Sequence, residues 1–259
     1  MFGLLIKKWF FDLWDNLLPA FILNAAVGFF VLGVPLVLAP WVGGFSSVAG
    51  QLIYALSILV VYVAVGIING YTWRMSKGER CHISALGDIL KRGFRQSLAL
   101  GLINVVLFEA VGFAIRFYGK QNDAISGIMT AILIWATIFW VFMLQYFFPI
   151  NAQLDTKLSK LFRKSALIFM DNTLFSFGIA IGSIVIIVIS AITLSLFPGI
   201  VGLVLWQQTA LKLRLYKYDH LEANPNTPKN AIPWDHLLRE ESDRIGHRTL
   251  KGMFFPWRD

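Results

Sequence analysis

The chain has 259 residues, of which 57% are hydrophobic and 15% are charged, and its mean hydropathy is +0.65. A soluble domain is about half apolar and about a quarter charged, so this composition indicates a membrane protein. The net charge of +8 would suggest nucleic acid in a soluble protein. Here the basic segments border apolar runs and lack the interleaved aromatic platforms of single-strand binders, which argues against a nucleic-acid partner. The single cysteine, Cys81, excludes an internal disulfide.

The first residues combine Lys7 and Lys8 with apolar side chains at helical spacing. Trp9, Asp12 and Asp15 break the order of regions that a signal peptide requires. We therefore expect an uncleaved amphipathic first helix.

Apolar runs of about 20 residues are long enough to cross the hydrocarbon core as helices. Such runs predict membrane spans at 17–41, 52–73, 97–117, 124–148, 173–197 and 199–213. The last run is short and contains Gln207 and Gln208, but five crossings would leave the basic carboxyl-terminal region on the outer side. The sequence therefore predicts an all-α membrane protein with about six transmembrane helices.

Positive charge is distributed unevenly between the predicted loops. Of the 23 Lys and Arg residues, all but Arg116 and Lys120 fall in segments that would share one side of the membrane. The positive-inside rule then places both termini in the cytoplasm of a bacterial-type inner-membrane protein.

Two of the predicted cytoplasmic connections share Leu, Phe, Arg and Ser in the same register, at 90–97 and 158–165. This similarity predicts up to three hairpins, each preceded by a basic amphipathic helix, although any basic helix beside a membrane would look similar. The basic side chains of these elbows are expected to contact anionic lipid headgroups. They are Lys91, Arg92, Arg95, Lys160, Arg163 and Lys164.

The composition changes near Tyr218, where Asn and Pro residues begin to mark a linker. We therefore divide the chain into a transmembrane domain at 1–217 and a cytoplasmic linker and soluble tail at 218–259. The tail ends in Phe254, Phe255, Pro256 and Trp257, an aromatic group that must bury on the membrane or on another protein.

Polar residues inside predicted spans are candidates for function because they are costly in hydrocarbon. Glu109 is the clearest case, with Asn104 before it and Arg116 two turns after it on a related face. It would either face a cavity as a proton or substrate contact, or pair with a neighbouring helix near the outer boundary. The same alternatives apply to Asn104 and Asn24, for which hydrogen bonding between helices is the simpler interpretation.

Signatures of catalysis are absent from the sequence. All four histidines lie outside the predicted spans, no pair has the spacing of a helical metal site, and no glycine-rich phosphate loop occurs. We therefore expect no enzyme, no metal and no cofactor.

Three groups of residues resemble a known family: Pro35 and Pro40, the segment 91–102, and the segment 146–155. Together they are similar to the YesL-like bacterial membrane proteins, whose function is unknown, over about residues 5–213. Members are typically encoded beside carbohydrate ABC importers. The resemblance implies a non-catalytic accessory subunit that binds the permease or the ATPase subunits of such an importer. The alternative is a free-standing carrier of small solutes with Glu109 in its site.

The tail also contains Glu240 followed by Gly246, and further on Phe255 and Pro256. This spacing resembles the loop by which permeases of ABC importers dock on their ATPase, although the segment is shorter and terminal. Partner binding through aromatic anchors is the more general expectation. The predicted partner-binding residues are Glu240, Gly246, Phe254, Phe255, Pro256 and Trp257.

Overall fold

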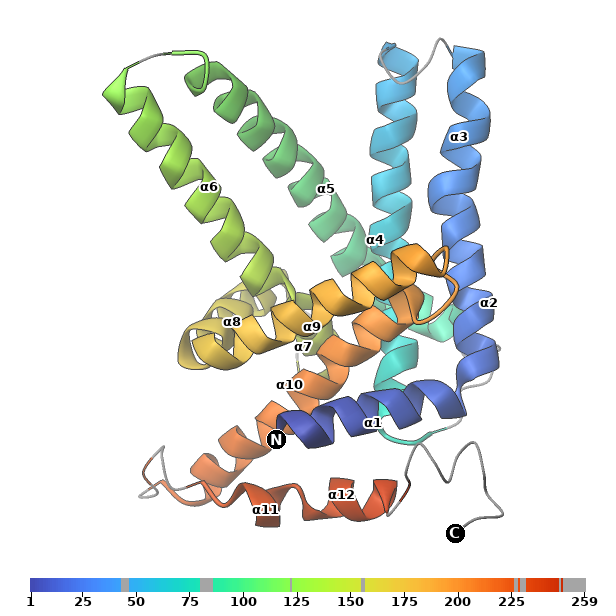
Figure 1. Ribbon diagram of the computed structural model, residues 1–259, viewed down its shortest axis with the longest axis vertical. Helices are drawn as coiled ribbons and strands as arrows, with labels where there is room; N and C mark the ends of the chain where they lie inside the picture. The colour runs from blue at the N-terminus through green and yellow to red at the C-terminus, as the bar shows by residue number, and fades with distance from the viewer. Residues whose placement is uncertain are drawn as a thin grey trace.

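The computed structural model describes residues 1–42, 47–79, 86–121, 123–154, 157–225, 228, 232–246 and 248. Every regular element within these ranges is helical, which confirms the all-α class (Figure 1). The longer elements are α1 (Phe2–Asp15), α2 (Leu17–Gly28), α4 (Val48–Ser76), α5 (Leu86–Tyr118), α6 (Ala124–Leu144), α8 (Leu158–Asp171), α9 (Thr173–Ile192) and α10 (Gly199–Ala223). The shorter ones are α3 (Val34–Leu38), α7 (Phe147–Gln153), α11 (Trp234–Leu237) and α12 (Arg239–Ile245).

Four segments of the described chain are long and apolar enough to cross a membrane: Val48–Ser76, Gly93–Tyr118, Ala124–Gln153 and Thr173–Ile192. They coincide with the second to fifth predicted spans. The first predicted span consists of α2, a π-helical stretch (Phe29–Gly33), α3 and a 3-10 turn (Ala39–Val42). The sixth lies within α10, which continues past the expected boundary to Ala223. The count of six spans stays a prediction.

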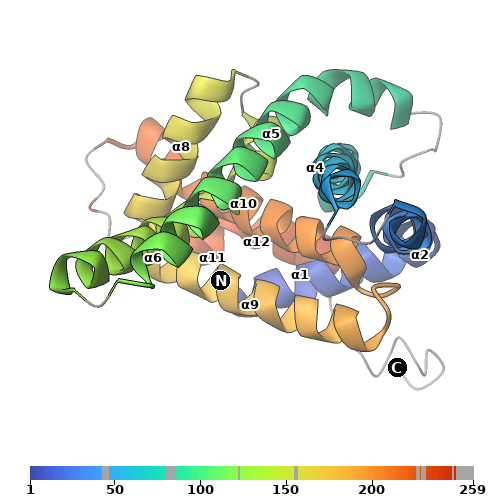
Figure 2. The same ribbon diagram turned by 90° about the horizontal axis from the view of Figure 1, so that it is seen from above.

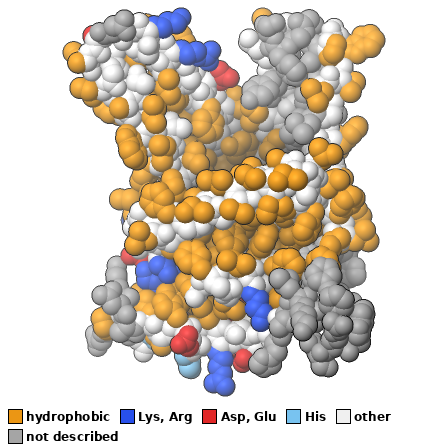
Figure 3. Space-filling model, viewed as in Figure 1, with side chains coloured by type: hydrophobic (Ala, Val, Ile, Leu, Met, Phe, Trp, Pro, Cys, Tyr) orange, Lys and Arg blue, Asp and Glu red, His pale blue; other side chains and the backbone are white. Residues whose placement is uncertain are grey.

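The helices form two arms that diverge from a common base (Figure 1). One arm contains α2, α3 and α4, and the other contains α5 and α6. The α9–α10 hairpin runs across the base of both arms in the two views, rather than parallel to α4 (Figures 1 and 2). Beneath it lie α1, α11 and α12. Hydrophobic side chains cover the middle of the face seen in Figure 3, and the coloured charged side chains lie at its upper tip and lower part.

Two of the three predicted amphipathic helices are separate elements, and they end in the same way. The 14-residue helices α1 and α8 both end at an Asp–Asn pair, beyond which α2 and α9 begin. At each corner the Asn side-chain amide donates to the backbone carbonyl four residues earlier, over 2.9 Å for Asn16 and 3.0 Å for Asn172. This shared corner supports a structural repeat of elbow and hairpin.

The third predicted amphipathic helix, at 90–97, forms the first turns of α5 instead of a separate elbow. Close packing against α4 explains this continuity. A Cβ atom at Gly66 would lie 1.9 Å from Ser97 Oγ, and one at Gly70 would lie 2.4 Å from Ile89 Cγ2. Only glycine allows the two helices to approach so closely at these positions.

The turn between α9 and α10 is held by Asn24 of α2. Its side-chain amide donates to the carbonyls of Leu196 and Pro198 over 3.1 and 2.9 Å, and its oxygen accepts from Val201 N at 2.9 Å. Gly199 has a positive φ of 61° and passes directly over this amide. Sequence alone marks Asn24 only as a polar residue in an apolar span, and its role as the anchor of a distant turn follows from the fold.

Replacing Gly199 with Ala should destabilise the protein by about 2 to 4 kcal/mol, because a side chain is strained at positive φ and clashes in a packed interior. The added Cβ would lie 2.3 Å from Asn24 Cγ. Thermal unfolding in detergent, followed by tryptophan fluorescence, measures the loss. Gly127→Ala in α6 is the matched control, since a Cβ there meets nothing within 4 Å. Equal melting temperatures for the two variants would contradict the assigned packing.

Candidate functional sites

The carboxyl-terminal end of α4 is surrounded by three cationic side chains. The carbonyl oxygen of Ser76 accepts hydrogen bonds from Lys8 Nζ at 2.8 Å, Lys212 Nζ at 3.0 Å and Arg244 Nη2 at 2.8 Å. A helix carries partial negative charge at this end, so the placement of cations there is favourable. These side chains come from α1, α10 and α12, which are remote from one another in the sequence.

Two carboxylates complete this group, which we call the basal charge cluster: Lys8, Asp12, Lys212, Glu241 and Arg244. Glu241 pairs with Lys8 at 3.0 Å and with Lys212, while Arg244 Nη2 lies 3.3 Å from its carboxylate. Asp12 accepts from Lys8 at 2.8 Å. Lys8 has 0% and Glu241 5% of its surface exposed, so these two ions are removed from solvent, while Lys212 is half-buried and Arg244 is exposed. Buried charges are tolerated only when they are paired in this way.

The two carboxyl groups of the cluster respond to burial in opposite directions. Burial alone would raise the pKa of Glu241, but the hydrogen bond from Lys212 and the positive charges of Lys8 and Lys212 bring it to about 2, from an ordinary 4.5. For Asp12, burial outweighs the attraction of Lys8 and raises the pKa above its usual 3.8. Glu241 is thus the carboxylate that the folded cluster holds ionised.

The tail lies along α1 beyond this cluster as well. Lys7 Nζ donates to the carbonyl of Gly246 at 3.0 Å, and Arg248 makes two hydrogen bonds to Asp15 at 2.7 and 2.8 Å. α12 and the described residues that follow it are therefore docked on the first helix, while α11 packs against α10.

Of the predicted partner-binding residues, Glu240 is exposed on α12 and Gly246 ends that helix with a φ of 63°. Phe254, Phe255, Pro256 and Trp257 lie outside the described residues. The sequence analysis did not identify the buried neighbour, Glu241. Lys8 and Lys212 could have indicated it, because both lie beside apolar sequence and each needs an acidic partner.

A second polar group joins the α8–α9 corner to α10. Lys217 Nζ pairs with Asp171 at 2.6 Å and donates to Asn172 Oδ1 at 3.2 Å. Arg214 Nε also donates to Asn172 Oδ1, and its guanidinium lies 4.8 Å from the Phe175 ring centroid. This set of contacts fixes the basic face of α10 against the second elbow.

Hydrogen bonds of uncharged side chains join α4, α7 and α10 in the interior. Asn69 of α4 donates to the carbonyl of Phe148 at 2.7 Å and accepts a hydrogen bond from Gln208 of α10. Gln153 of α7 donates to Gln208 Oε1 at 2.6 Å. Asn104 lies in a similar setting, because its oxygen accepts from Trp140 Nε1 at 2.8 Å. Interhelical pairing therefore accounts for Asn104, as it does for Asn24.

Glu109 differs from these residues because its side chain is exposed. It borders a groove of about 510 Å³ on the distal part of α5, together with Phe113, Arg116, Phe117 and Lys120. Arg116 donates to the carbonyl of Gly112 at 3.1 Å. No hydrogen bond or ion pair joins the Glu109 carboxylate to another residue in the described part of the chain. A carboxylate in this position requires contact with water or with a partner protein.

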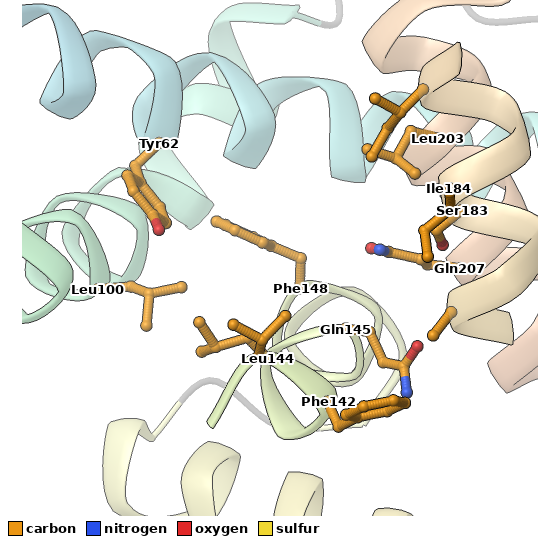
Figure 4. Close-up of a pocket in the computed structure, with 13 residues that line it drawn as sticks. Tyr62, Leu100, Phe142, Leu144, Gln145, Phe148, Ser183, Ile184, Leu203 and Gln207 are labelled. Carbon is orange, nitrogen blue, oxygen red and sulfur yellow. The ribbon is translucent and has the colours of Figure 1, made fainter. Parts of the chain in front are cut away.

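A separate cavity of about 380 Å³ lies where the arms meet the α9–α10 hairpin, and we call it the junction cavity (Figure 4). Its walls are mainly apolar and come from α4, α5, α6, α7, α9 and α10. Tyr62, Gln145, Ser183 and Gln207 supply the polar groups at its surface. Figure 4 shows the Gln207 amide directed into the space beside Phe148. Ser183 Oγ is buried and has no hydrogen-bond partner among the described residues.

The predicted lipid-binding elbows are described only in part. Arg95, Lys160 and Arg163 are exposed, and Lys164 is half-buried on α8. The side chains of Lys91 and Arg92 lie outside the described set. Leu167 and Met170 are 58% and 64% exposed on the same helix α8, so it presents both basic and apolar side chains, as interfacial helices do.

Among the described residues no group of three His, Cys, Asp or Glu side chains could hold a metal ion. Comparison of the chain with protein-family models, curated proteins and solved structures gave no match. The resemblance to the YesL-like family stays a prediction.

Changing Glu241 to Gln should release α12 from α1, because three cations would lose their shared carboxylate. Breaking a buried ion pair costs about 3 to 5 kcal/mol, so amide exchange in residues 239–245 should accelerate by about a hundredfold or more. Hydrogen–deuterium exchange followed by mass spectrometry measures this rate directly. Glu240→Gln is the matched control on the exposed side of the same helix, and equal exchange in the two variants would count against the cluster as the anchor.

The same exchange measurement has an expected pH dependence in the unmodified protein. Since the pKa of Glu241 is lowered by folding, its contribution is complete above about 4.5 and is lost as the pH falls towards about 2. The raised pKa of Asp12 contributes with the opposite sign, favouring the folded state at low pH and offsetting part of the loss. Docking should therefore persist from neutral pH to mildly acidic pH and weaken below it.

Proposed function

We propose that this chain is a non-catalytic accessory subunit of a bacterial carbohydrate ABC importer, located in the inner membrane with both termini in the cytoplasm. The observation that carries the proposal is the docked tail. The basal charge cluster fixes α12 on α1, and the opposite side of α12 exposes Arg239, Glu240 and Asp243. A short helix held rigidly at the membrane boundary is a suitable contact for a partner subunit, because little ordering is needed on binding.

The orientation is supported by the distribution of charge over the fold. The carboxyl-terminal ends of α3 and α5 lie at the far end of the arms, while α1, α11 and α12 lie at the base (Figure 1). The cations of the basal charge cluster therefore gather at one end of the molecule. By the positive-inside rule this end faces the cytoplasm, where the ATPase subunits of an importer reside.

The junction cavity favours an accessory role over sugar transport by the chain itself. A sugar presents many hydroxyl groups, and a site for it must pair most of them, since unpaired polar groups are costly. The junction cavity supplies only four polar side chains among its 13 lining residues. Its chemistry suits an apolar ligand much better than a carbohydrate.

Co-purification tests the accessory role. The full-length chain, tagged and expressed with the permease and ATPase subunits of a carbohydrate importer from the same genome, should retain them through purification. Arg239→Ala combined with Asp243→Ala should reduce retention about fivefold or more, as loss of an interface hot spot does. Lys160→Ala on α8 is the control and should leave retention unchanged. A chain that purifies alone, or equal retention by both variants, would overturn the proposal.

The second candidate function is a free-standing small-solute carrier, and the exposed carboxylate of Glu109 is the observation that favours it. Uptake of radiolabelled mono- and disaccharides into vesicles containing only this chain provides the test. A carrier should show uptake that falls at least tenfold in Glu109→Gln, because a required proton or substrate contact is lost. The accessory subunit should show none, and Gln121→Glu serves as the control for changes at the rim of the same groove.

A further inference from the structure

We propose that the junction cavity is a binding site for one acyl chain of a membrane glycerolipid, with the ester carbonyl of that chain at the polar edge of the cavity. The occupant follows from three features of the site: its depth in the membrane, the hydrogen-bonding character of its polar groups and the exposure of its rim. The proposal is independent of the importer role.

The depth of the cavity is set by α6. This helix has 21 residues from Ala124 to Leu144, which span about 31 Å at 1.5 Å per residue. The hydrocarbon core is about 30 Å thick, so in a membrane crossed by α6 alone Gln145 would lie near the opposite headgroup boundary from Asp123. The apolar segment itself continues through α7 to Gln153. Lipid ester groups are found at the headgroup boundary. An acyl chain entering from there would run along the apolar walls formed by Phe142, Leu144 and Ile184.

The polar groups of the cavity include hydrogen-bond donors that can pair with an ester carbonyl. An ester carbonyl accepts hydrogen bonds and donates none. The Tyr62 and Ser183 hydroxyls and the Gln207 amide can all donate. Ser183 Oγ already lacks a partner among the described residues, so a ligand acceptor would satisfy a buried polar group that is otherwise costly. The described lining contains no charged side chain, which argues against a phosphate or a fatty-acid carboxylate inside the cavity.

The rim of the cavity faces the lipid phase. Val141 of α6 is 53% exposed, and Ile184 and Ile187 of α9 are 60% and 53% exposed. These side chains belong to two segments that are long and apolar enough to cross a membrane. The volume of about 380 Å³ is within the range of about 300 to 1,000 Å³ that is typical of small-molecule sites. A lipid chain can therefore enter sideways from the bilayer without crossing a polar barrier.

Photolabelling and native mass spectrometry test this site on the full-length chain. The protein is reconstituted into phosphatidylethanolamine vesicles that contain phosphatidylcholine with a diazirine in one acyl chain, and is then irradiated. We expect labels concentrated on the lining peptides of α6 and α9, and one phosphatidylcholine retained per chain after transfer to detergent. Labelling spread evenly over all exposed spans, or no retained lipid, would overturn the proposal.

Filling the cavity provides the matched comparison. Ala180→Phe places a ring in the lining, and should reduce retained lipid at least fivefold. Ile181→Phe adds a ring at the next residue of α9, which is 62% exposed, and should change nothing. Equal retention by the two variants would refute the site. Melting temperatures of both variants establish whether each is folded.

Hydrogen bonding to the ester is tested without adding bulk, so the result does not depend on the folding of Ala180→Phe. Ser183→Val removes the hydroxyl and should lower retention about threefold to tenfold, as loss of one neutral hydrogen bond does. A dialkyl phosphatidylcholine, which has ether linkages and no ester carbonyl, should compete with the ester lipid less well by a similar factor. Full competition by the ether lipid together with normal retention by Ser183→Val would refute the ester contact.

Discussion

The contact of three cations with the end of α4 is the interaction on which the base of the molecule depends. Burying Lys8, and partly burying Lys212, would be costly without nearby negative charge. The Ser76 carbonyl, Asp12 and Glu241 supply it together. Because these residues belong to different helices, satisfying their charges requires α1, α10 and α12 to meet at the end of α4. The docked tail follows from the electrostatics of the membrane domain.

The two elbows, α1 and α8, end in the same local structure. In both, an amphipathic helix ends at Asp–Asn, the Asn amide caps the carbonyl four residues earlier, and an apolar helix starts at the next residue. The two corners differ in what surrounds them. Asn172 also accepts hydrogen bonds from Arg214 and Lys217 of α10. Asn16 is followed by α2, in which Asn24 holds the α9–α10 turn. The last hairpin therefore connects both elbows.

Sequence reasoning reached the helical class, four of the six predicted spans and two of the three predicted elbows, because each depends on a local pattern of residues. It reached neither the buried Glu241 nor the junction cavity. Glu240 and Glu241 are equivalent as sequence, and only the position of α12 against Lys8 and Lys212 decides which of them is buried. The cavity is assembled from six helices, so no segment contains its pattern. The continuous α5 was missed because the packing of Gly66 and Gly70 is a property of two helices together.

Charged and neutral polar side chains make their contacts in different parts of the molecule. At the base, ion pairs fix the tail strongly because one buried partner cannot leave without stranding the others. In the interior, Asn69, Gln208 and Gln153 connect α4, α10 and α7 through neutral amides, which avoid the cost of charge in hydrocarbon. The exposed carboxylate of Glu109 fits neither arrangement. Its side chain is exposed beside the groove on the distal part of α5 and is bonded to no described residue. An unpaired carboxylate is costly in hydrocarbon, so this part of α5 is where water or a second protein would contact the chain.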